Sequence, residues 1–110
     1  ESRTHRPQEM KYRVRFTPGA EEDLLRLFDH LAEQDLPAAV RAQAAIAKSM
    51  AFLELFPFSC RKAQGGPPNP LLREMIIPFG NAGYVALFEI EDPGTVTLLA
   101  VRHQREEDYH

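Results

Sequence analysis

The hydrophobic periodicity changes along the chain, and this order of patterns limits the fold more than any single motif. Apolar and charged residues alternate over 12–16, which predicts a half-buried strand. From Thr17 and Pro18, an N-cap and a first helical residue, the apolar spacing becomes helical. A second, alanine-rich helix is expected from Pro37 to about Phe56, and the short connection predicts an antiparallel helical hairpin. The apolar face expected on the second helix runs through Val40, Ala44, Ala47, Met50, Ala51 and Leu55.

The second half of the chain has the pattern of a β-meander. Residues 57–70 are rich in proline and glycine and are expected to form a loop. Three strand candidates follow at 72–77, 84–90 and 95–101, separated by turn sequences. The order β-α-α-β-β-β therefore predicts a small two-layer α+β domain, in which the N-terminal helical hairpin packs on a mostly antiparallel four-stranded sheet.

Length and composition limit the classes of protein that remain. The 110 residues suffice for one domain, expected over 10–110, with 1–9 as a flexible arm or a cloning remnant. No apolar run approaches the ~18 residues of a membrane span, so we expect a cytoplasmic protein. The single Cys60 excludes an intramolecular disulfide. No metal or cofactor is expected, because no metal-ligand spacing relates His5, His30, His103 and His110.

The charge distribution is uneven. Against 16 acidic residues the chain has 13 basic ones, a net charge of -3, which argues against a broadly basic nucleic-acid-binding surface. Residues 21–35 alone carry a net charge of -5, whereas basic residues gather at 61–73 and 102–105. A local basic site therefore remains possible. Cys60 stands next to Arg61 and Lys62, a position expected to lower its pKa.

Taken in order, several segments resemble the RelE/ParE toxins of bacterial type II toxin–antitoxin systems. The resemblance covers residues 11–109 and implies the fold described above, a cognate antitoxin as partner and a toxin–antitoxin hetero-oligomer. The segments that carry it are YRVRFTPGAEEDL at 12–24, LFP at 55–57, LRE at 72–74, GYVALF at 83–88 and VRHQRE at 101–106.

The two branches of this family differ in their targets. RelE-like members cut mRNA in the ribosome with several basic residues, whereas ParE-like members inhibit DNA gyrase by direct binding. Three positions that are basic in the cutting branch fall near Ile76, Pro78 and Val85, which carry no charge. RNA cleavage needs a base and cations for the developing charge. The resemblance therefore favours a protein-binding gyrase inhibitor over a ribosome-dependent mRNA endonuclease, and a non-toxic binding module is a third hypothesis.

The resemblance and the residue patterns together suggest candidate site residues. Tyr84 and Phe88 share one face of a strand and are interpreted as core rather than as a base-stacking platform. For the basic candidates, the alternative interpretation is that they are solvated side chains of loops and strand ends without a binding role. Expected to contact the target are Arg61, Lys62, Arg73, Arg102, His103 and Arg105. A ribonuclease would use Arg73, His103, Arg105 and Tyr109. Expected to contact the antitoxin are Leu27, Leu31, Val40, Ala47 and Tyr84, with the open sheet edge.

Overall fold

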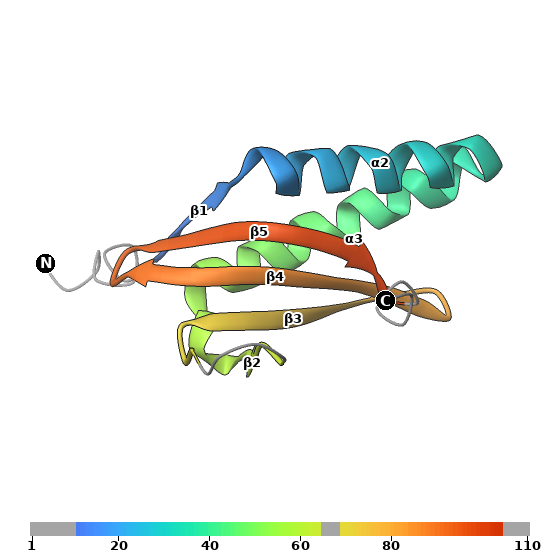
Figure 1. The fold of residues 1–110 in the computed structure, drawn as a ribbon. Helices are drawn as coiled ribbons and strands as arrows, with labels where there is room; N and C mark the ends of the chain where they lie inside the picture. Colours follow the sequence, from blue (N-terminus) through green and yellow to red (C-terminus); the bar gives the residue numbers. More distant parts are fainter. Residues whose placement is uncertain (1–10, 65–68, 105–110) are drawn as a thin grey trace, which may run out of the picture.

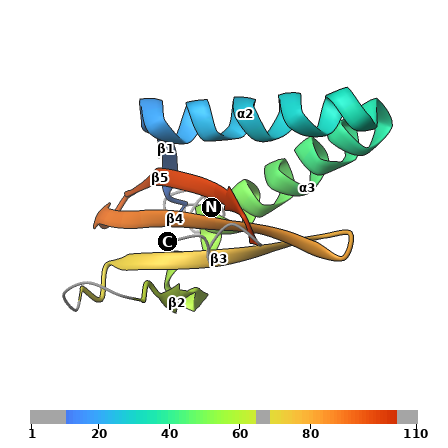
Figure 2. The same ribbon diagram turned by 45° about the vertical axis from the view of Figure 1, so that its right-hand side comes forward.

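Two helices lie on one face of a twisted five-stranded sheet (Figures 1 and 2). The computed structural model describes residues 11–64 and 69–104. The α+β class and the order of the main elements are confirmed. The elements are β1 (Arg13–Phe16), α2 (Pro18–Gln34), α3 (Leu36–Leu55), the 3-10 turn η2 (Pro57–Ser59), β2 (Arg61–Lys62), β3 (Leu72–Phe79), β4 (Ala82–Asp92) and β5 (Thr95–His103).

The sheet has the order β1-β5-β4-β3-β2, so it has five strands rather than the expected four. β3, β4 and β5 form the antiparallel meander, and β1 pairs in parallel with β5. The additional strand is β2, which lies in the segment expected to be a loop and pairs with only Arg73 and Glu74. Two residues are too few to produce a readable alternation, so tertiary contacts define this strand.

Both helices begin at side chains that cap them. The hydroxyl of Thr17 accepts a hydrogen bond from Ala20 N–H at 3.1 Å and donates to the carbonyl of Leu98 at 3.0 Å. This bond joins the start of α2 to β5. Asp35 both ends α2 and caps α3, where its carboxylate accepts from Ala38 N–H at 3.0 Å. α3 therefore begins directly after Asp35, one residue earlier than expected.

The hydrophobic core fills the space between the sheet and the helices. Phe88 and Leu98 are fully buried, Tyr84 is 4% exposed, and Leu53 approaches them from α3. The interpretation of Tyr84 and Phe88 as core residues is confirmed. No helix in the described ranges has the length and apolarity that a membrane span requires.

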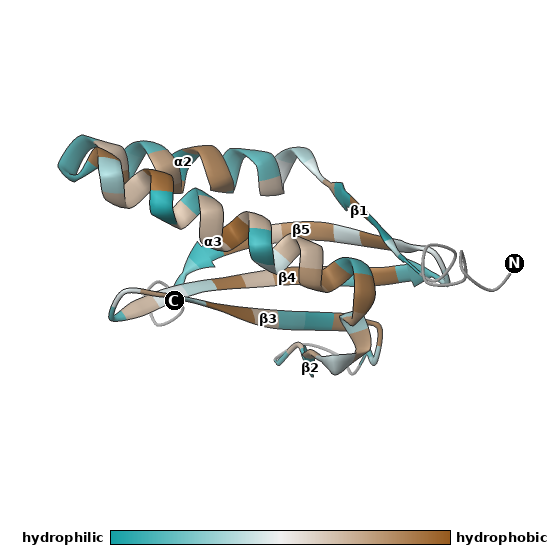
Figure 3. Cartoon of the chain, turned by 180° about the vertical axis from the view of Figure 1, so that it is seen from behind, coloured by the Kyte–Doolittle hydropathy of each residue, from teal (hydrophilic) through white to brown (hydrophobic). Residues whose placement is uncertain are grey.

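The expected apolar face of α3 is largely wrong, because of its six residues only Met50 packs against the core. Val40 and Leu55 are 54% and 48% exposed, and Ala44, Ala47 and Ala51 are also exposed. The buried residues of α3 are Ala38, Ala39, Ala42 and Leu53. Alanine occupies both buried and exposed positions of α3, so the spacing of apolar residues alone does not identify the buried side. Figure 3 shows hydrophobic and hydrophilic colours mixed along the visible side of this helix.

Candidate functional site

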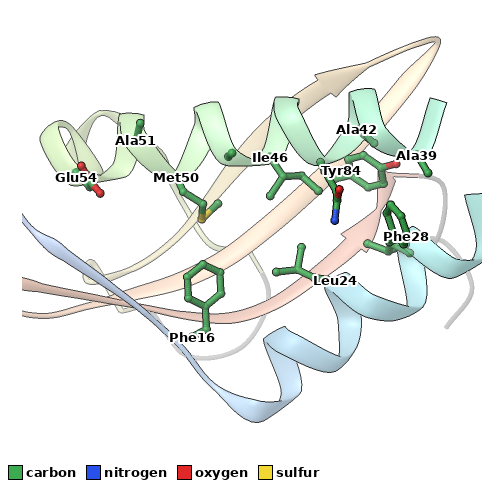
Figure 4. A pocket seen from close by; sticks show the side chains of 13 residues that line it. Phe16, Leu24, Phe28, Ala39, Ala42, Ile46, Met50, Ala51, Glu54 and Tyr84 are labelled. Atoms are coloured by element: carbon green, nitrogen blue, oxygen red, sulfur yellow. The ribbon is translucent and has the colours of Figure 1, made fainter. Parts of the chain in front are cut away.

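An apolar groove runs between α2 and α3, where the facing side chains of the two helices leave a hollow (Figure 4). Its volume is about 530 Å³. Leu24 and Phe28 point into it from α2, and Ile46 and Met50 from α3. Phe16, which is 39% exposed, lines the end of the groove near β1. The groove is thus a hydrophobic surface with suitable chemistry for the apolar side of an amphipathic segment.

Three of the five residues expected to contact an antitoxin line this groove. Leu27 and Tyr84 are largely buried and form part of its floor, whereas Ala47 lies exposed on its rim. Leu31 lines a neighbouring cleft, and Val40 is an exposed residue of α3 that does not line the groove. The structure therefore brings most of this set together, and their contact with an antitoxin stays a prediction.

His103 lies on the helix side of the sheet, apart from most of the basic residues. It is paired with Tyr84 across β4 and β5, and the two rings meet edge to face with their centroids 5.7 Å apart. Phe79 stacks on the other side of Tyr84 at 6.1 Å. Burial raises the pKa of the Tyr84 hydroxyl. With His30 and Arg26, these residues line a cleft of about 830 Å³ between α2 and the β3–β4 turn.

On the opposite, helix-free face of the sheet, two arginines hold a buried carboxylate. Glu74 is only 7% exposed. Its Oε1 accepts from the Nε of Arg61 at 3.1 Å, and a terminal guanidinium nitrogen of Arg61 lies 3.0 Å from the same oxygen. Arg102 approaches Oε2 at 3.7 Å from β5. The three side chains connect β2, β3 and β5 across the sheet, and they make this face locally cationic by one charge.

Arg73, by contrast, makes hydrogen bonds to backbone carbonyls of the segments before β2 and before β3. Its Nε donates to the carbonyl of Pro70 at 2.7 Å, and one terminal nitrogen donates to the carbonyls of Cys60 and Phe58 at 2.8 and 3.2 Å. The guanidinium also lies over the Phe58 ring, 5.2 Å from its centroid. Lys62, its cross-strand neighbour, is exposed on β2. The described residues of the expected target-binding set therefore lie in three places. Arg61 and Arg102 are beside Glu74, Arg73 and Lys62 are near Cys60, and His103 is beside Tyr84.

The local environment of Cys60 reverses the expectation for its acidity. Burial raises the pKa of the thiol above its ordinary 9.0, and the charge of Arg73 lowers it by a smaller amount. The arginine that matters is the one that contacts the Cys60 carbonyl, not Arg61 beside it in sequence. The expected depression of the pKa is wrong because desolvation outweighs the neighbouring charge.

Ile76, Pro78 and Val85, to which the resemblance assigns the basic positions of the RNA-cutting branch, form an apolar strip on the helix-free face. Ile76 pairs with Val85 directly, and Pro78 lies two residues along the same side of β3. Val85 in turn pairs with Arg102. Arg105 and Tyr109, which complete the ribonuclease hypothesis, lie outside the described residues. Within 11–64 and 69–104 no group of histidine, cysteine and acidic side chains could hold a metal ion.

Two carboxylates with clear roles were not singled out from the sequence. Glu74 lies at the centre of the arginine pair, and Asp23 accepts a hydrogen bond from Val101 N–H at 2.9 Å, which fastens α2 to β5. The opposite charges of Arg61 and Glu74 are the only signal that could have suggested the first contact. That signal requires the pairing of β2 with β3, which the sequence does not show.

Comparisons with known proteins agree with this architecture. A family model described as "ParE toxin of type II toxin-antitoxin system, parDE" matches residues 14–108. A solved structure described as "Chromosomal ParDE TA system from P. aeruginosa" superposes with a TM-score of 0.65 at 17% sequence identity, covering 86% of this chain and 97% of that one. At that identity the likeness shows the fold. No curated protein matches the chain.

Proposed function

The chain belongs to the ParE toxin family of type II toxin–antitoxin systems, and from this premise we propose that it inhibits DNA gyrase in the cytoplasm by direct binding and is neutralised by a cognate antitoxin. The antitoxin would bind as a hetero-oligomer and cover the groove between α2 and α3. Inhibition of this kind is interference between proteins and requires no chemical step by the toxin.

The observation that carries the proposal is the apolar strip on the helix-free face. By the family resemblance, the positions at which the cutting branch has cations fall near Ile76 and Pro78 and on Val85, which are uncharged. Phosphodiester cleavage by basic groups depends on positive charge aimed at the transferring phosphate. Two cations of this face, Arg61 and Arg102, are engaged by the carboxylate of Glu74. A phosphate would have to compete with this carboxylate, which supports protein binding over RNA cleavage.

The hairpin groove supports the antitoxin part of the proposal. The groove has a volume of about 530 Å³, and Leu24, Ile46 and Met50 point into it. Exposed apolar surface of this kind marks interaction sites, because a bound partner removes it from water. A partner that binds only the folded toxin would also stabilise it by mass action. An amphipathic helix or an extended apolar segment has suitable chemistry for this groove.

Purified toxin provides the direct test of the target. Added to bacterial DNA gyrase and relaxed plasmid, it is expected to stop supercoiling and to accumulate cleaved DNA. Added to a translation extract, it is expected to leave mRNA intact. Codon-linked mRNA cleavage without an effect on gyrase would replace the proposal by the endonuclease hypothesis. Normal growth of cells that express the toxin without its antitoxin would contradict both toxic hypotheses.

Two matched alanines on α3 test the antitoxin surface. Ala47 lines the groove and Ala44 does not, although both are exposed. We expect Ala47→Glu to weaken binding of the protein encoded beside the toxin by at least tenfold in calorimetry, because a carboxylate would be desolvated in the groove. Ala44→Glu should bind like the unchanged chain. Equal affinity of both variants would exclude this groove as the antitoxin site.

A further inference from the structure

Large apolar side chains are exposed together at one corner of the domain, where α3 ends and η2 begins. Phe52, Phe56 and Phe58 are 41%, 51% and 53% exposed, and the rings of Phe52 and Phe56 meet with their centroids 5.4 Å apart. Leu55 and Leu71 are also exposed. Figure 3 shows strongly hydrophobic colours at the end of α3. These five residues are referred to below as the aromatic corner.

The backbone under the aromatic corner is fixed on two sides. η2 begins at the buried Pro57. Arg73 donates hydrogen bonds to the carbonyls of Phe58 and Pro70, and these bonds join η2 to the segment that leads into Leu71. The exposed rings therefore belong to a defined surface, and little backbone entropy is lost when a partner covers them.

The aromatic corner projects from the domain instead of lining a groove. Figures 1 and 2 show the turn between α3 and β2 on the side of the sheet away from α2. The residues that α3 contributes to the α2–α3 groove are different ones, and of the corner residues only Phe52 lines one of the four hollows described on this chain. A projecting apolar surface requires a recess in a rigid partner but none in a deformable one.

Positive charge surrounds the aromatic corner. Between residues 48 and 75 the sequence has two acidic side chains and four basic ones, which are Lys48, Arg61, Lys62 and Arg73. Lys48 lines the same hollow as Phe52, and the guanidinium of Arg73 lies 5.2 Å from the centroid of the Phe58 ring. The hydrogen bonds of Arg73 described above end on neutral carbonyls, so they leave its charge uncompensated.

The carboxylates near this corner are mostly paired, and the excess negative charge of the chain lies elsewhere. Glu54 pairs with Lys11 at 3.5 Å, and Glu74 is buried between two arginines. Glu89, opposite Leu72 on β4, is half-buried. Residues 48–75 carry a net charge of +2, whereas residues 21–35, which form most of α2, carry -5. This separation turns the aromatic corner toward a negative surface and α2 away from it.

The combination of exposed rings and cations favours an anionic lipid surface over a second copy of this chain. If two corners packed against each other, Lys62 and Arg73 of each copy would meet like charges. A lipid interface accepts both kinds of side chain, because phenylalanine and leucine enter the boundary between headgroups and acyl chains while lysine and arginine approach the phosphates. It also deforms around a projecting corner.

We propose that the aromatic corner is a peripheral binding site for bilayers that contain anionic phospholipids. The rings of Phe52, Phe56 and Phe58 enter the interface at the level of the headgroups. Lys48 and Lys62 approach lipid phosphates, and α2 faces away from the bilayer. The site has no residue in common with the lining of the α2–α3 groove and does not depend on the inhibition of gyrase.

Sedimentation of the full chain with vesicles measures this binding. Vesicles of phosphatidylcholine with about one third phosphatidylglycerol should bind the chain at least tenfold more tightly than vesicles of phosphatidylcholine alone. Raising the ionic strength from about 0.1 M to about 1 M should weaken the binding, because the Debye length falls from about 10 Å to about 3 Å. Absence of binding, or equal binding to both kinds of vesicle, would overturn the proposal.

The sequence has no tryptophan, so one introduced tryptophan reports on a single position. With anionic vesicles, Phe58→Trp should shift its emission to shorter wavelength and be quenched by brominated lipid. Leu25→Trp is the matched control, because Leu25 is 62% exposed on the acidic helix α2, and it should show neither effect. Quenching at position 25 without quenching at position 58 would contradict the proposed orientation and with it the site.

Substitutions separate the contributions of the rings and the charges. The double variant Phe56→Ser, Phe58→Ser should weaken vesicle binding at least tenfold, whereas Leu25→Ser should leave it within twofold. Lys62→Glu should weaken it at least fivefold. Arg41→Glu makes the same charge change at an exposed position of α3 about 21 Å before the end of the helix, and it should leave binding within twofold.

Circular dichroism and urea unfolding identify the variants that are folded, and the comparison uses only these. Vesicle binding that is unchanged both in the double serine variant and in Lys62→Glu would overturn the proposal. A concentration-dependent sedimentation coefficient without vesicles, abolished by the serine substitutions, would replace it by pairing of two copies. If the unchanged chain inhibits gyrase without binding vesicles and the serine variant loses inhibition, the corner is a contact with the protein target instead.

Discussion

Replacing Arg73 separates a structural role from a target contact. Its guanidinium makes three hydrogen bonds to backbone carbonyls at 2.7, 2.8 and 3.2 Å and covers the ring of Phe58. These carbonyls belong to Pro70, Cys60 and Phe58, so one side chain connects η2, the start of β2 and the approach to β3. We expect Arg73→Ala to loosen this corner of the domain while leaving the central sheet intact.

The magnitude follows from the exposure of these bonds. A hydrogen bond contributes about 1 kcal/mol net, and solvent competes for the exposed bonds to Pro70 and Phe58. The contact with the Phe58 ring adds about 0.5 kcal/mol at an exposed site. Arg73→Ala should therefore lower the free energy of unfolding by about 2 kcal/mol and the Tm by roughly 8–16 °C. Arg73→Lys keeps the charge but not the planar fork, so it should recover less than half of the loss.

Urea unfolding followed by circular dichroism measures this loss, and gyrase inhibition is measured at a temperature at which the variant is still folded. Arg15→Ala is the matched control, because its ion pair with Glu91 is exposed at 3.8 Å and should change stability by less than ~0.5 kcal/mol. We expect folded Arg73→Ala to retain inhibition. Unchanged stability together with lost inhibition would refute the structural role and make Arg73 a target contact.

Three further changes test other parts of the structure. Gly83 has φ +136°, and a Cβ there would lie 2.3 Å from the carbonyl oxygen of Ile77. Gly83→Ala should therefore lower the free energy of unfolding by more than about 3 kcal/mol. Gly80→Ala, which has open space around it, should lower it by about 1 kcal/mol. Thr17→Ala should lose about 1–2 kcal/mol in urea unfolding and Thr17→Ser should restore most of it, because the hydroxyl caps α2 and bonds to β5. Because the folded Cys60 thiol has a raised pKa, its alkylation should reach its half-maximal rate above pH 9.0. The thiol of the unfolded chain ionises at lower pH than the folded one, so the free energy of unfolding should fall as the pH rises through 9.0. Cys60→Ser should remove that part of the fall.

The elements with strong local signals were predictable, and the elements that depend on distant contacts were not. The start of α2 at Thr17 and Pro18 follows from capping chemistry, and the meander follows from turns between alternating strands. β2 has only two residues and exists because Arg61 meets Glu74 across the strand pair. The buried side of α3 was not predictable because alanine is small enough to face either the core or solvent.

The candidate site shows the same division. The groove residues Leu27 and Tyr84 follow from periodicity and do lie together. The basic residues were grouped by their proximity in sequence, but adjacent residues of a strand point to opposite faces. Arg102 therefore faces Glu74, whereas His103 contacts Tyr84 on the helix side. Basic residues that are adjacent at the end of a strand, such as Arg102 and His103, are therefore on opposite faces and do not form one charge cluster.

The carboxylate of Glu74 bears on what the helix-free face can recognise. It is buried between Arg61 and Arg102, and the cost of burying a charge means that this arrangement persists only while both arginines stay close. The face consequently offers an organised set of donors with one uncompensated positive charge beside Ile76, which is 37% exposed, whereas Val85, its partner on β4, is fully buried. A polyanionic backbone gains little from such a surface, since its affinity grows with the number of uncompensated cations. A protein surface, which presents single carboxylates among apolar side chains, matches it better, and this is the reason to seek the target of this toxin among proteins.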